Sequence, residues 1–366
     1  MKKFGLFNSL VIAIALLGLP AISSTAFGAD DVEEVVAVGS RREARSVGDS
    51  PAPVDVISGS DFVNQGAMDL PDMIRTLVPS FNVNTQPISD AATLIRPANL
   101  RGLPPDNMLV LVNGKRRHRG AVISFLGSGI SDGAQGPDIS AIPSIALKQV
   151  EVLRDGASAQ YGSDAIAGIL NFVLRDNSEG TQLEIRTGEY KEGDGDAWRI
   201  AANVGLPFTS AGFANLSIEL QDSKATSRSV QRADAQGLYD GGNTAIWNYP
   251  EPAQIWGSPD VSDDYKFVVN LGVSLDESKD FYLFGNYGER NVLGGFFFRN
   301  PTNRGGVFST DGGATRLVGD VAEATTGAAR TCPVIPVPAS GAGSSTDALL
   351  AAVKADPNCF VFNEMW

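Results

Sequence analysis

Five segments after Gly180 alternate apolar and polar side chains with a period of two, as β-strands with one apolar face do. Each has about 8 to 11 residues, the length of a tilted membrane-crossing strand. After a first connection at about 191–196, short connections at 207–212 and 276–279 alternate with long ones, about 222–264 and the residues after 290. This alternation is typical of a transmembrane β-barrel. The five segments are TQLEIRTGEY, WRIAANVGLPF, ANLSIELQ, YKFVVNLGVSL and FYLFGNYGE.

The period alone also fits a soluble β-sandwich or a β-solenoid, because every half-buried strand alternates in this way. The order of the loops favours the membrane barrel. If the first strand runs outward, the long loops lie outside the cell and the two short turns lie in the periplasm. Five strands cannot close a barrel, and single-chain barrels have even strand counts from 8 upward. We therefore expect an incomplete barrel that is part of a longer protein.

The first residues have the organisation of a secretory signal. Lys2 and Lys3 form a positive start, Leu10–Leu19 is apolar, and Ala26-Phe27-Gly28 offers small residues before a cleavage site. An uncleaved anchor is the alternative, but the apolar run is shorter than the about 20 residues that span a bilayer. The sequence predicts a signal peptide at residues 1–28 and an exported protein.

Charge and cysteine content restrict the possible partners. The net charge of −13 argues against a nucleic-acid partner. In an exported chain Cys332 and Cys359 are expected to form a disulfide, although the sequence leaves open whether the bond forms. Two cysteines and the single histidine, His118, are too few for a structural zinc site. No metal and no cofactor is expected.

Residues 53–176 predict one compact α/β unit. PVDVISGSDF predicts a strand that leads into a helix starting near Ser58 or Ser60. The pair Asn113-Gly114 favours a two-residue hairpin turn. Two further strands are expected at Gln149–Leu153 and at Ile169–Asp176. Helical spacing is seen at Leu70, Met73, Ile74 and Leu77.

Three motifs, in this order, resemble the N-terminal part of a TonB-dependent outer-membrane receptor. EEVVAVGSRR resembles the TonB box, and LIRPANLRGLPPDNMLVLVNGKR resembles the plug signature. VEVLRDGASAQYGSDAIAGILNFVLR resembles the end of the plug. The resemblance covers roughly residues 30 to 176. It implies an α/β plug domain followed by antiparallel transmembrane β-barrel strands, here an incomplete barrel.

The resemblance also implies a division of the chain and a location. After the signal peptide, residues 29–50 would hold the TonB box and a linker, 51–176 the plug domain and 177–366 the N-terminal portion of the barrel. In the family the plug fills a 22-strand barrel. The expected location is the outer membrane of a Gram-negative bacterium, with outer-membrane lipid around the barrel.

The implied activity is energy-coupled uptake of a scarce ligand, with no enzymatic chemistry. The ligand would bind from outside, and the box would pair as an added strand with a TonB-type energy transducer of the inner membrane. Ferric siderophores and similar ferric chelates, cobalamin, haem and oligosaccharides all remain open as ligands. The expected box residues are Val32, Glu33, Glu34, Val35, Val36, Ala37 and Val38.

Several residues occupy positions of the plug motifs. Arg101, Glu151 and Arg154 stand where charged plug residues of the family latch onto carboxylates of the barrel wall. The glycines are expected to permit tight turns and close packing rather than phosphate binding, since no Gly-Lys-Ser/Thr ending follows them. The full set is Arg101, Gly102, Asn113, Gly114, Glu151, Arg154, Gly156, Tyr161, Gly162, Gly168 and Asn171.

A basic run follows the expected hairpin turn. Arg116, Arg117, His118 and Arg119 form a possible ligand-binding apex that would attract an anionic ligand. The alternative is a solvated hairpin tip or a latch that faces the wall.

Three other interpretations of the whole chain stay open. The first is a ligand-binding or adhesion protein of the outer membrane that does not transport. The second is a secreted periplasmic enzyme with a β domain, and the third is a truncated plug from a degraded gene.

Overall fold

The structure is a computed structural model, and all elements from β2 onward belong to one unit, Val36–Trp366. The main described ranges are 54–83, 92–124, 129–231, 257–276 and 278–294. Shorter described pieces are 35–36, 45–46, 233, 236, 315–316, 318–320, 323, 326–329, 331–333, 335–336, 351–353 and 355–361. The expected signal peptide lies outside the described residues, as does most of the expected TonB box, of which only β1 (Val35–Val36) is described.

Residues 54–176 form an α/β domain around a mixed sheet with the strand order β3-β8-β9-β6-β7. β6 and β9 run parallel, and the other neighbours run antiparallel. β3 is an edge strand, so the first strand of the domain pairs only with β8 in this sheet. The strands are β3 (Val54–Ser58), β6 (Met108–Val112), β7 (Lys115–Arg116), β8 (Leu147–Leu153) and β9 (Gly168–Leu174).

Two helices, α2 (Gly59–Val63) and α3 (Leu70–Leu77), begin at side chains that satisfy their first free amides. Ser58 caps α2 in a capping box, and the Asp69 carboxylate accepts the first-turn amide of α3 at 3.0 Å. The helical spacing predicted for α3 is confirmed, and its apolar side joins the core of the domain. Each such buried side chain contributes about 1.5–3 kcal/mol. The buried members are Leu70, Met73 and Ile74.

Short elements complete the α/β domain. The predicted hairpin between β6 and β7 is confirmed, with Asn113 at φ 47° and Gly114 at φ 72° as this turn requires. The remaining elements are β4 (Phe81–Val83), which pairs with β5 (Ala98–Leu100), α4 (Ala92–Ile95), η2 (Pro105–Asn107), η3 (Gly129–Ser131), η4 (Ser144–Ala146), α5 (Ser158–Tyr161) and η5 (Ser163–Ala165).

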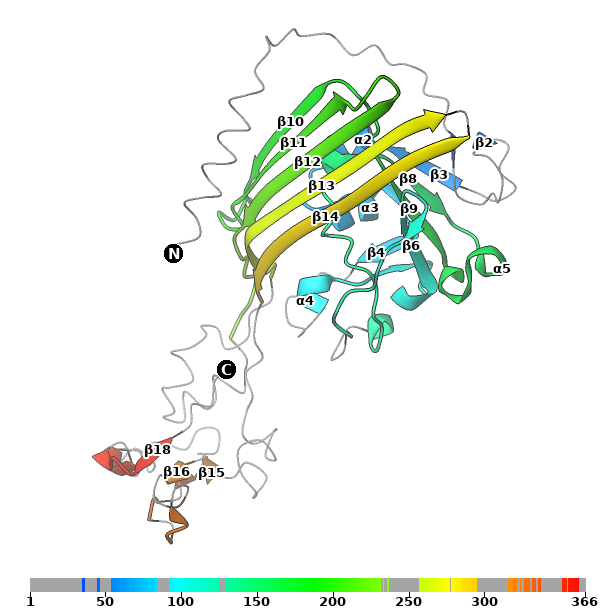
Figure 1. Cartoon of the computed structure of the whole chain (residues 1–366). Helices are drawn as coiled ribbons and strands as arrows, with labels where there is room; N and C mark the ends of the chain where they lie inside the picture. Colours follow the sequence, from blue (N-terminus) through cyan, green and yellow to red (C-terminus); the bar gives the residue numbers. More distant parts are fainter. Residues whose placement is uncertain are drawn as a thin grey trace. The chain divides into compact units, whose positions relative to one another are not determined.

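Five long strands follow in a second sheet, in which each strand pairs antiparallel with the next (Figure 1). All five predicted strands are confirmed. β13 and β14 extend beyond the predicted segments because each continues through an irregularity of register. The members of this antiparallel sheet are β10 (Thr181–Gly188), β11 (Ala197–Pro207), β12 (Gly212–Ser223), β13 (Asp260–Asp276) and β14 (Lys279–Leu293).

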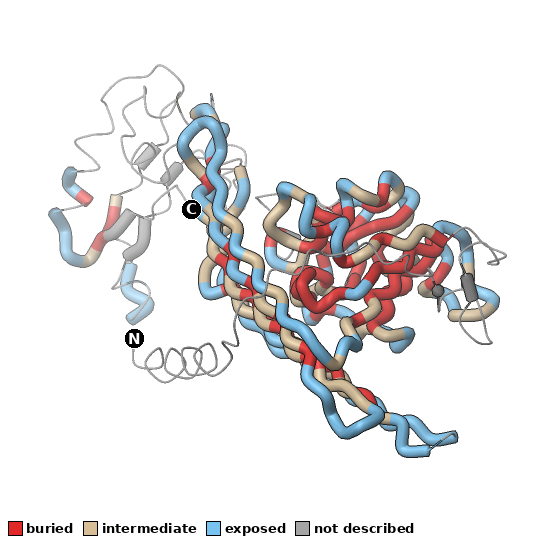
Figure 2. Tube along the Cα trace, turned by 90° about the horizontal axis from the view of Figure 1, so that it is seen from above, coloured by how far each residue is buried: buried red, intermediate tan, exposed pale blue. Residues whose placement is uncertain are grey.

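The antiparallel sheet has one apolar and one polar face. Leu183 and Ile185 of β10 are 65% and 66% exposed, and the register aligns Ile185 with Ile200 of β11 on the same face. On the opposite face Glu219 of β12 stands beside Lys266 of β13, and both are buried. Figure 2 shows that continuous burial is concentrated in the α/β domain, whereas the long strands alternate. An apolar outer face with a polar inner face is the pattern of a transmembrane barrel wall.

The polar face packs against the α/β domain. Val268 of β13 is 4% exposed and belongs to the same hydrophobic core as β8 and β9, with Phe284 packed against it. Among the described residues, none of the helices is both long and apolar enough to cross a membrane. The remaining short strands are β2 (Arg45–Ser46), β15 (Thr315–Arg316), β16 (Val318–Asp320), β17 (Ile335–Pro336) and β18 (Cys359–Val361).

Candidate functional site

Three of the motif residues meet inside the α/β domain. Asn171 of β9 donates through Nδ2 to Glu151 Oε2 at 3.0 Å, and its Oδ1 accepts the backbone N–H of Gly114 at 2.9 Å. Gln149 donates to the other Glu151 oxygen at 3.0 Å. Glu151 and Asn171 are each 1% exposed. A fully bonded polar group in a core fixes local geometry, so this network holds the hairpin turn on β9.

The hairpin turn also touches the antiparallel sheet. Asn113 Oδ1 accepts the Leu174 amide at 2.8 Å, and Asn113 Nδ2 donates to Asn270 Oδ1 of β13 at 3.2 Å. Asn270 in turn donates to the Arg175 carbonyl at 2.9 Å. The end of β9 and the turn at Gly114 are therefore both joined to one strand of the antiparallel sheet.

Arg199 of β11 is the centre of a buried ion network on the polar face. The side chain is fully buried, and its guanidinium donates to Glu219 Oε2 at 2.7 and 2.9 Å and to Glu184 Oε1 at 2.8 Å. Lys266 Nζ donates to the second oxygen of Glu219 at 2.6 Å. Arg199 also donates to Ser144 Oγ of the α/β domain at 2.6 Å. Because the charges are paired within the sheet, the domain needs to supply only a neutral acceptor.

Arg186 of β10 holds the segment that follows α2. Its guanidinium donates to four backbone oxygens of the α/β domain, those of Phe62, Val63, Gln65 and Ala67. Carbonyls at the end of a helix lack partners within the helix, and a cation there satisfies them. Arg186 therefore attaches the end of α2 to the antiparallel sheet.

A three-residue ion cluster lies at the start of α3. Arg96, at φ 53°, donates to Asp69 Oδ2 and, at 3.0 Å, to Asp72 Oδ2. Burial alone would raise the pKa of Asp69, but attraction to Arg96 and hydrogen bonds with Asp72 outweigh it and lower that pKa. Burial and the neighbouring charge of Asp69 raise the pKa of Asp72.

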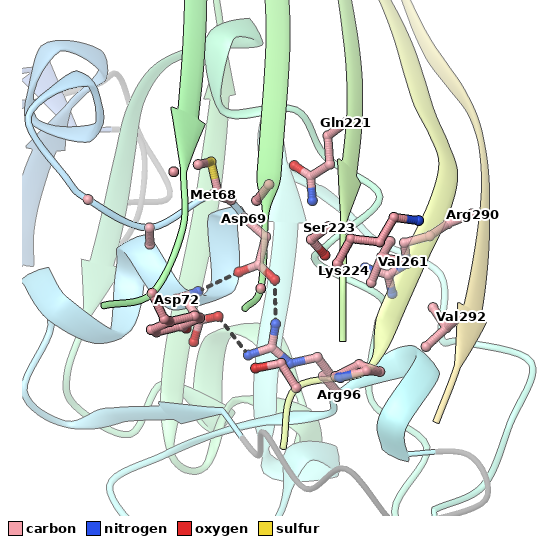
Figure 3. Close-up of a pocket in the computed structure, with 18 of the residues that line it drawn as sticks. Met68, Asp69, Asp72, Arg96, Gln221, Ser223, Lys224, Val261, Arg290 and Val292 are labelled. Atoms are coloured by element: carbon pink, nitrogen blue, oxygen red, sulfur yellow. Dashed lines mark hydrogen bonds and ion pairs between the residues drawn. The ribbon is translucent and has the colours of Figure 1, made fainter. Parts of the chain in front are cut away.

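This cluster forms one side of a cavity of about 400 Å³ (Figure 3). Gln221 and Ser223 of β12 and Arg290 of β14 line it from the antiparallel sheet, and Lys224 lines it from the residue after β12. The loops that join β10 to β11 and β12 to β13 approach the same cavity through Tyr190 and the segment 258–259. The cavity thus lies at the long-loop end of the strands.

The loops at this end are held together by Arg228. Its guanidinium pairs with Asp194 and with Glu192 at 3.3 Å, and it lies 5.9 Å from the centre of the Tyr190 ring. Lys224 donates its backbone N–H to the Asp196 carbonyl at 2.8 Å. The first residues after β12 are therefore fixed against the β10–β11 loop.

The remaining motif residues lie apart from the antiparallel sheet. Arg154 pairs with Asp55 of β3 at 2.7 Å, within the α/β domain. Arg101 and Gly102 form a turn with φ 56° and 71°, and the Arg101 side chain is exposed. Of the three expected latch residues, Glu151 and Arg154 thus bond to partners of the α/β domain itself.

The motif from Gly156 to Gly168 forms the turn region before β9. Tyr161 ends α5 and Gly162 follows at φ 93°. Gly168 has φ 141°, and a Cβ there would lie 2.3 Å from the Leu153 carbonyl oxygen. Only glycine fits so close an approach, which accounts for Gly168 on the backbone alone. A Cβ on Gly156 would be 3.3 Å from the Ile166 carbonyl oxygen.

The basic run is largely paired within its own domain. Arg116 pairs with Asp164, and Arg119 lies 3.6 Å from Asp106. Arg117 donates to Asn286 of β14 at 2.6 Å. The charge of Arg117, together with burial, lowers the pKa of His118. These four side chains line a smaller cavity of about 140 Å³ beside β6.

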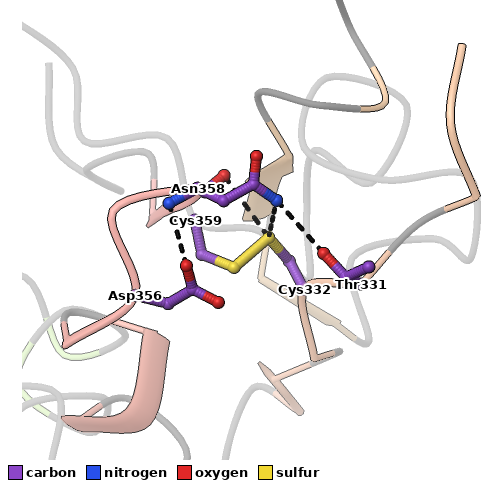
Figure 4. The surroundings of a disulfide bond; sticks show 5 residues. All are labelled: Thr331, Cys332, Asp356, Asn358 and Cys359. Carbon is purple, nitrogen blue, oxygen red and sulfur yellow. Dashed lines mark hydrogen bonds between the residues drawn. A yellow bond between two sulfur atoms is a disulfide. The ribbon is translucent and has the colours of Figure 1, made fainter. Parts of the chain in front are cut away.

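Cys332 and Cys359 are joined by a disulfide across a sequence separation of 27 residues (Figure 4). Asn358, next to the bond, donates through its side chain to Thr331 at 3.1 Å and through its backbone amide to the Asp356 carboxylate at 2.9 Å. In the part of the chain that the structure describes, no cluster of three or more His, Cys, Asp or Glu side chains could hold a metal ion.

Comparison with protein families gives a match to the TonB-dependent Receptor Plug Domain over residues 46–169. The matched residues therefore form a plug domain of the TonB-dependent receptor type. The α/β domain is therefore the plug domain, and the family places the chain in the outer membrane.

Named relatives include a vitamin B12 transporter and an iron-regulated outer membrane virulence protein. The Vitamin B12 transporter BtuB of Photobacterium profundum is 28% identical over 194 residues, which are 53% of this chain and 28% of that protein. The Iron-regulated outer membrane virulence protein of Vibrio cholerae is 30% identical over 177 residues, 47% of this chain and 25% of that protein. The matched part of the chain therefore spans little more than a quarter of these relatives.

Similar solved structures include two siderophore receptors. The ferric enterobactin receptor PfeA of Pseudomonas aeruginosa has 18% identity and a TM-score of 0.49, covering 66% of this chain and 33% of that one. The siderophore receptor PirA of Acinetobacter baumannii has 21% identity and a TM-score of 0.49, covering 65% and 32%.

Sequence reasoning missed the residues that join the plug domain to the antiparallel sheet. The strand pattern places Arg186 and Lys266 only among the polar positions, and it gives Arg199 no role. A usable signal existed, because a charged side chain on the non-apolar face of a membrane strand cannot face lipid and needs a partner inside.

Proposed function

We propose that the chain is the N-terminal part of an outer-membrane receptor that takes up a scarce ligand, a ferric siderophore or a similar molecule, with energy from a TonB-type transducer. The observation that carries the proposal is the contact between the plug domain and the antiparallel sheet. The domain is hydrogen-bonded to the polar face of a sheet whose opposite face is apolar. A plug inside a membrane wall blocks free passage, so uptake requires that it move.

The proposed division of labour follows the sequence. Residues 1–28 direct export, 29–50 carry the box and linker, 51–176 form the plug and 177–366 begin the barrel. The box, Val32 to Val38, would add as a strand to a sheet of the transducer, because a short β-prone segment needs only backbone hydrogen bonds for that contact. The next strand of the plug domain along the chain is β3, which lies at the edge of its sheet.

The named relatives support transport over enzymatic chemistry. One is named as a vitamin B12 transporter, and another as an iron-regulated outer membrane virulence protein. Ferric siderophores, other ferric chelates, cobalamin, haem and oligosaccharides are the ligand classes to test. The long-loop end of the strands, with its cavity and the Arg228 contacts, is the proposed ligand side.

Energy dependence tests the proposal. Cells that express the whole natural gene would be given labelled members of each ligand class, with and without a proton uncoupler. We expect one class to bind in both conditions and to enter only in energised cells. Binding without energised entry would instead support the adhesion alternative, and release of the protein from washed membranes by salt alone would support the soluble enzyme.

A further inference from the structure

A bulge on the polar face of the antiparallel sheet places two acidic residues opposite one arginine. Ser262 pairs with Asn291 and Tyr265 with Glu289, so Asp263 and Asp264 of β13 both oppose Arg290 of β14. Asp263, at φ 51°, is exposed, whereas Asp264 is buried on the polar face. Bulges commonly re-aim a side chain in this way.

Asp264 is short of hydrogen-bond donors. Its side chain is 1% exposed, and neither carboxylate oxygen accepts a hydrogen bond from the described residues. The nearest cation, Lys266 Nζ, is 3.4 Å away and donates to Glu219 at 2.6 Å. Gln221 of β12, which is the register partner of Asp264, also has a buried Oε1 without a donor among the described residues. A buried carboxylate left in this state is costly.

Arg290 is the donor that the register supplies, yet its guanidinium points elsewhere. It donates to the backbone carbonyl of Leu94 in α4 of the plug domain. A carboxylate is a stronger acceptor for a guanidinium than a neutral carbonyl. While the plug domain contacts the sheet, Arg290 therefore binds the Leu94 carbonyl and not Asp264 on the neighbouring strand.

The surroundings allow Arg290 to change partner. Arg290 and Gln221 both line the cavity of about 400 Å³, together with Thr93 and Arg96 on the plug side (Figure 3). Asp264 and Arg290 lie opposite each other on neighbouring strands, so the exchange calls for rotation of the Arg290 side chain. A long, flexible arginine side chain makes such rotations quickly.

We propose that Arg290 is an exchangeable contact between the plug domain and the sheet. It holds the Leu94 carbonyl while segment 92–96 is seated, and it pairs with Asp264 when that segment moves away. The pair formed on release offsets part of the free energy lost with the plug contact. The free energy needed to move this segment is therefore lower than the loss of the Leu94 contact alone would require. The device does not depend on which ligand is taken up.

Hydrogen exchange of the whole receptor, without ligand, tests the exchange of partners. The readout is amide exchange in segment 92–96. Asp264→Asn removes the carboxylate that waits for Arg290, so opening of the segment should become rarer and exchange roughly tenfold slower, the scale of one hydrogen bond to a charged group. The matched control is Asp263→Asn, the same change on the other residue of the bulge, which should leave exchange unchanged.

A second background separates the proposal from a general effect of Asp264. In Arg290→Met the Asp264→Asn change should have no further effect on segment 92–96. Equal slowing with and without Arg290, or no slowing at all, would overturn the proposal. Exchange in β8 and β9 reports whether each variant is folded, and Asp264→Ala, which removes both oxygens, replaces Asp264→Asn if that variant fails this check.

Discussion

Arg199 Nη2 lies 2.6 Å from Ser144 Oγ, and this hydrogen bond joins an ion network centred on the fully buried Arg199 of the antiparallel sheet to the plug domain. The charges of the network are balanced on the sheet side by Glu184, Glu219 and Lys266. The plug contributes neutral acceptors here and at the carbonyls that Arg186 binds. A seat of this kind holds the plug by hydrogen bonds that can be broken without leaving a charge unpaired on the plug.

Arg199→Met should destabilise the receptor strongly. It removes the partner of the buried Glu219 and of the partly buried Glu184, and breaking a buried ion pair costs about 3–5 kcal/mol. Thermal unfolding of the purified receptor measures the effect. Lys279→Met is the control, because Lys279 forms an exposed pair with Asp276 that solvent and salt screen. Equal shifts for the two variants would contradict the network.

Asn171→Leu should loosen the hairpin turn of the plug. The change removes the side chain that donates to Glu151 Oε2 at 3.0 Å and accepts the Gly114 amide at 2.9 Å, and loss of a donor to a buried carboxylate costs about 1–3 kcal/mol. Faster amide exchange at residues 111–116 is the measurement. Asn64→Leu, which loses one exposed 3.4 Å hydrogen bond, should not change that exchange.

Asp72→Asn should flatten the dependence of plug stability on pH. The pKa of Asp72 is raised by burial and by Asp69, so the folded plug binds this proton more readily than the unfolded chain and gains stability as the pH falls toward 3.8. An asparagine side chain does not titrate and cannot contribute that gain. The pKa of Asp69 is lowered, so its contribution is present above 3.8 and is lost as the pH falls through the lowered value.

Exchange of the α3 amides, corrected for the intrinsic effect of pH, measures this dependence. We expect the opening free energy of α3 to rise between neutral pH and pH 3.8 in the natural sequence and to rise less in Asp72→Asn. An identical slope in both proteins would show that Asp72 has its ordinary pKa in the folded plug.

Val269→Arg should impair insertion into membranes. Val269 aligns with Leu216 on the apolar face near the middle of β13, and an arginine facing lipid at the bilayer midplane costs about 2–4 kcal/mol. Leu275→Arg, on the same face near the end of the strand, should cost about 0–1 kcal/mol. Folding yield of the whole receptor into lipid vesicles distinguishes them, and equal yields would contradict the assignment of this face to lipid.

The sequence was sufficient for the elements whose pattern is local. The period of two located β10 to β14, and the Asn113-Gly114 pair located its turn, because each depends on neighbouring residues. The parallel pairing of β6 with β9 could not be read in this way, since it joins segments about 60 residues apart. Glu151, Asn171 and Gly114 meet because of that pairing.

The contacts between plug and sheet could not be predicted from local sequence patterns, because they too join residues far apart in the sequence. Arg117 was part of a run that looked uniformly basic, yet the fold gives it Asn286 of β14 and gives Arg116 and Arg119 acidic partners from distant turns. The alternation of Arg186 and Arg199 with apolar residues showed which face they occupy. It held no information about the plug atoms that face them.

Deletion of Val32–Val38 from the whole natural receptor tests the central claim most directly, with deletion of residues 42–48 as a control of equal length. Ligand binding to intact cells and energised uptake of the same labelled ligand would be measured together. The account predicts that loss of Val32–Val38 abolishes uptake and leaves binding intact, whereas the control deletion leaves both. Undiminished uptake without Val32–Val38 would contradict energy-coupled transport through this segment.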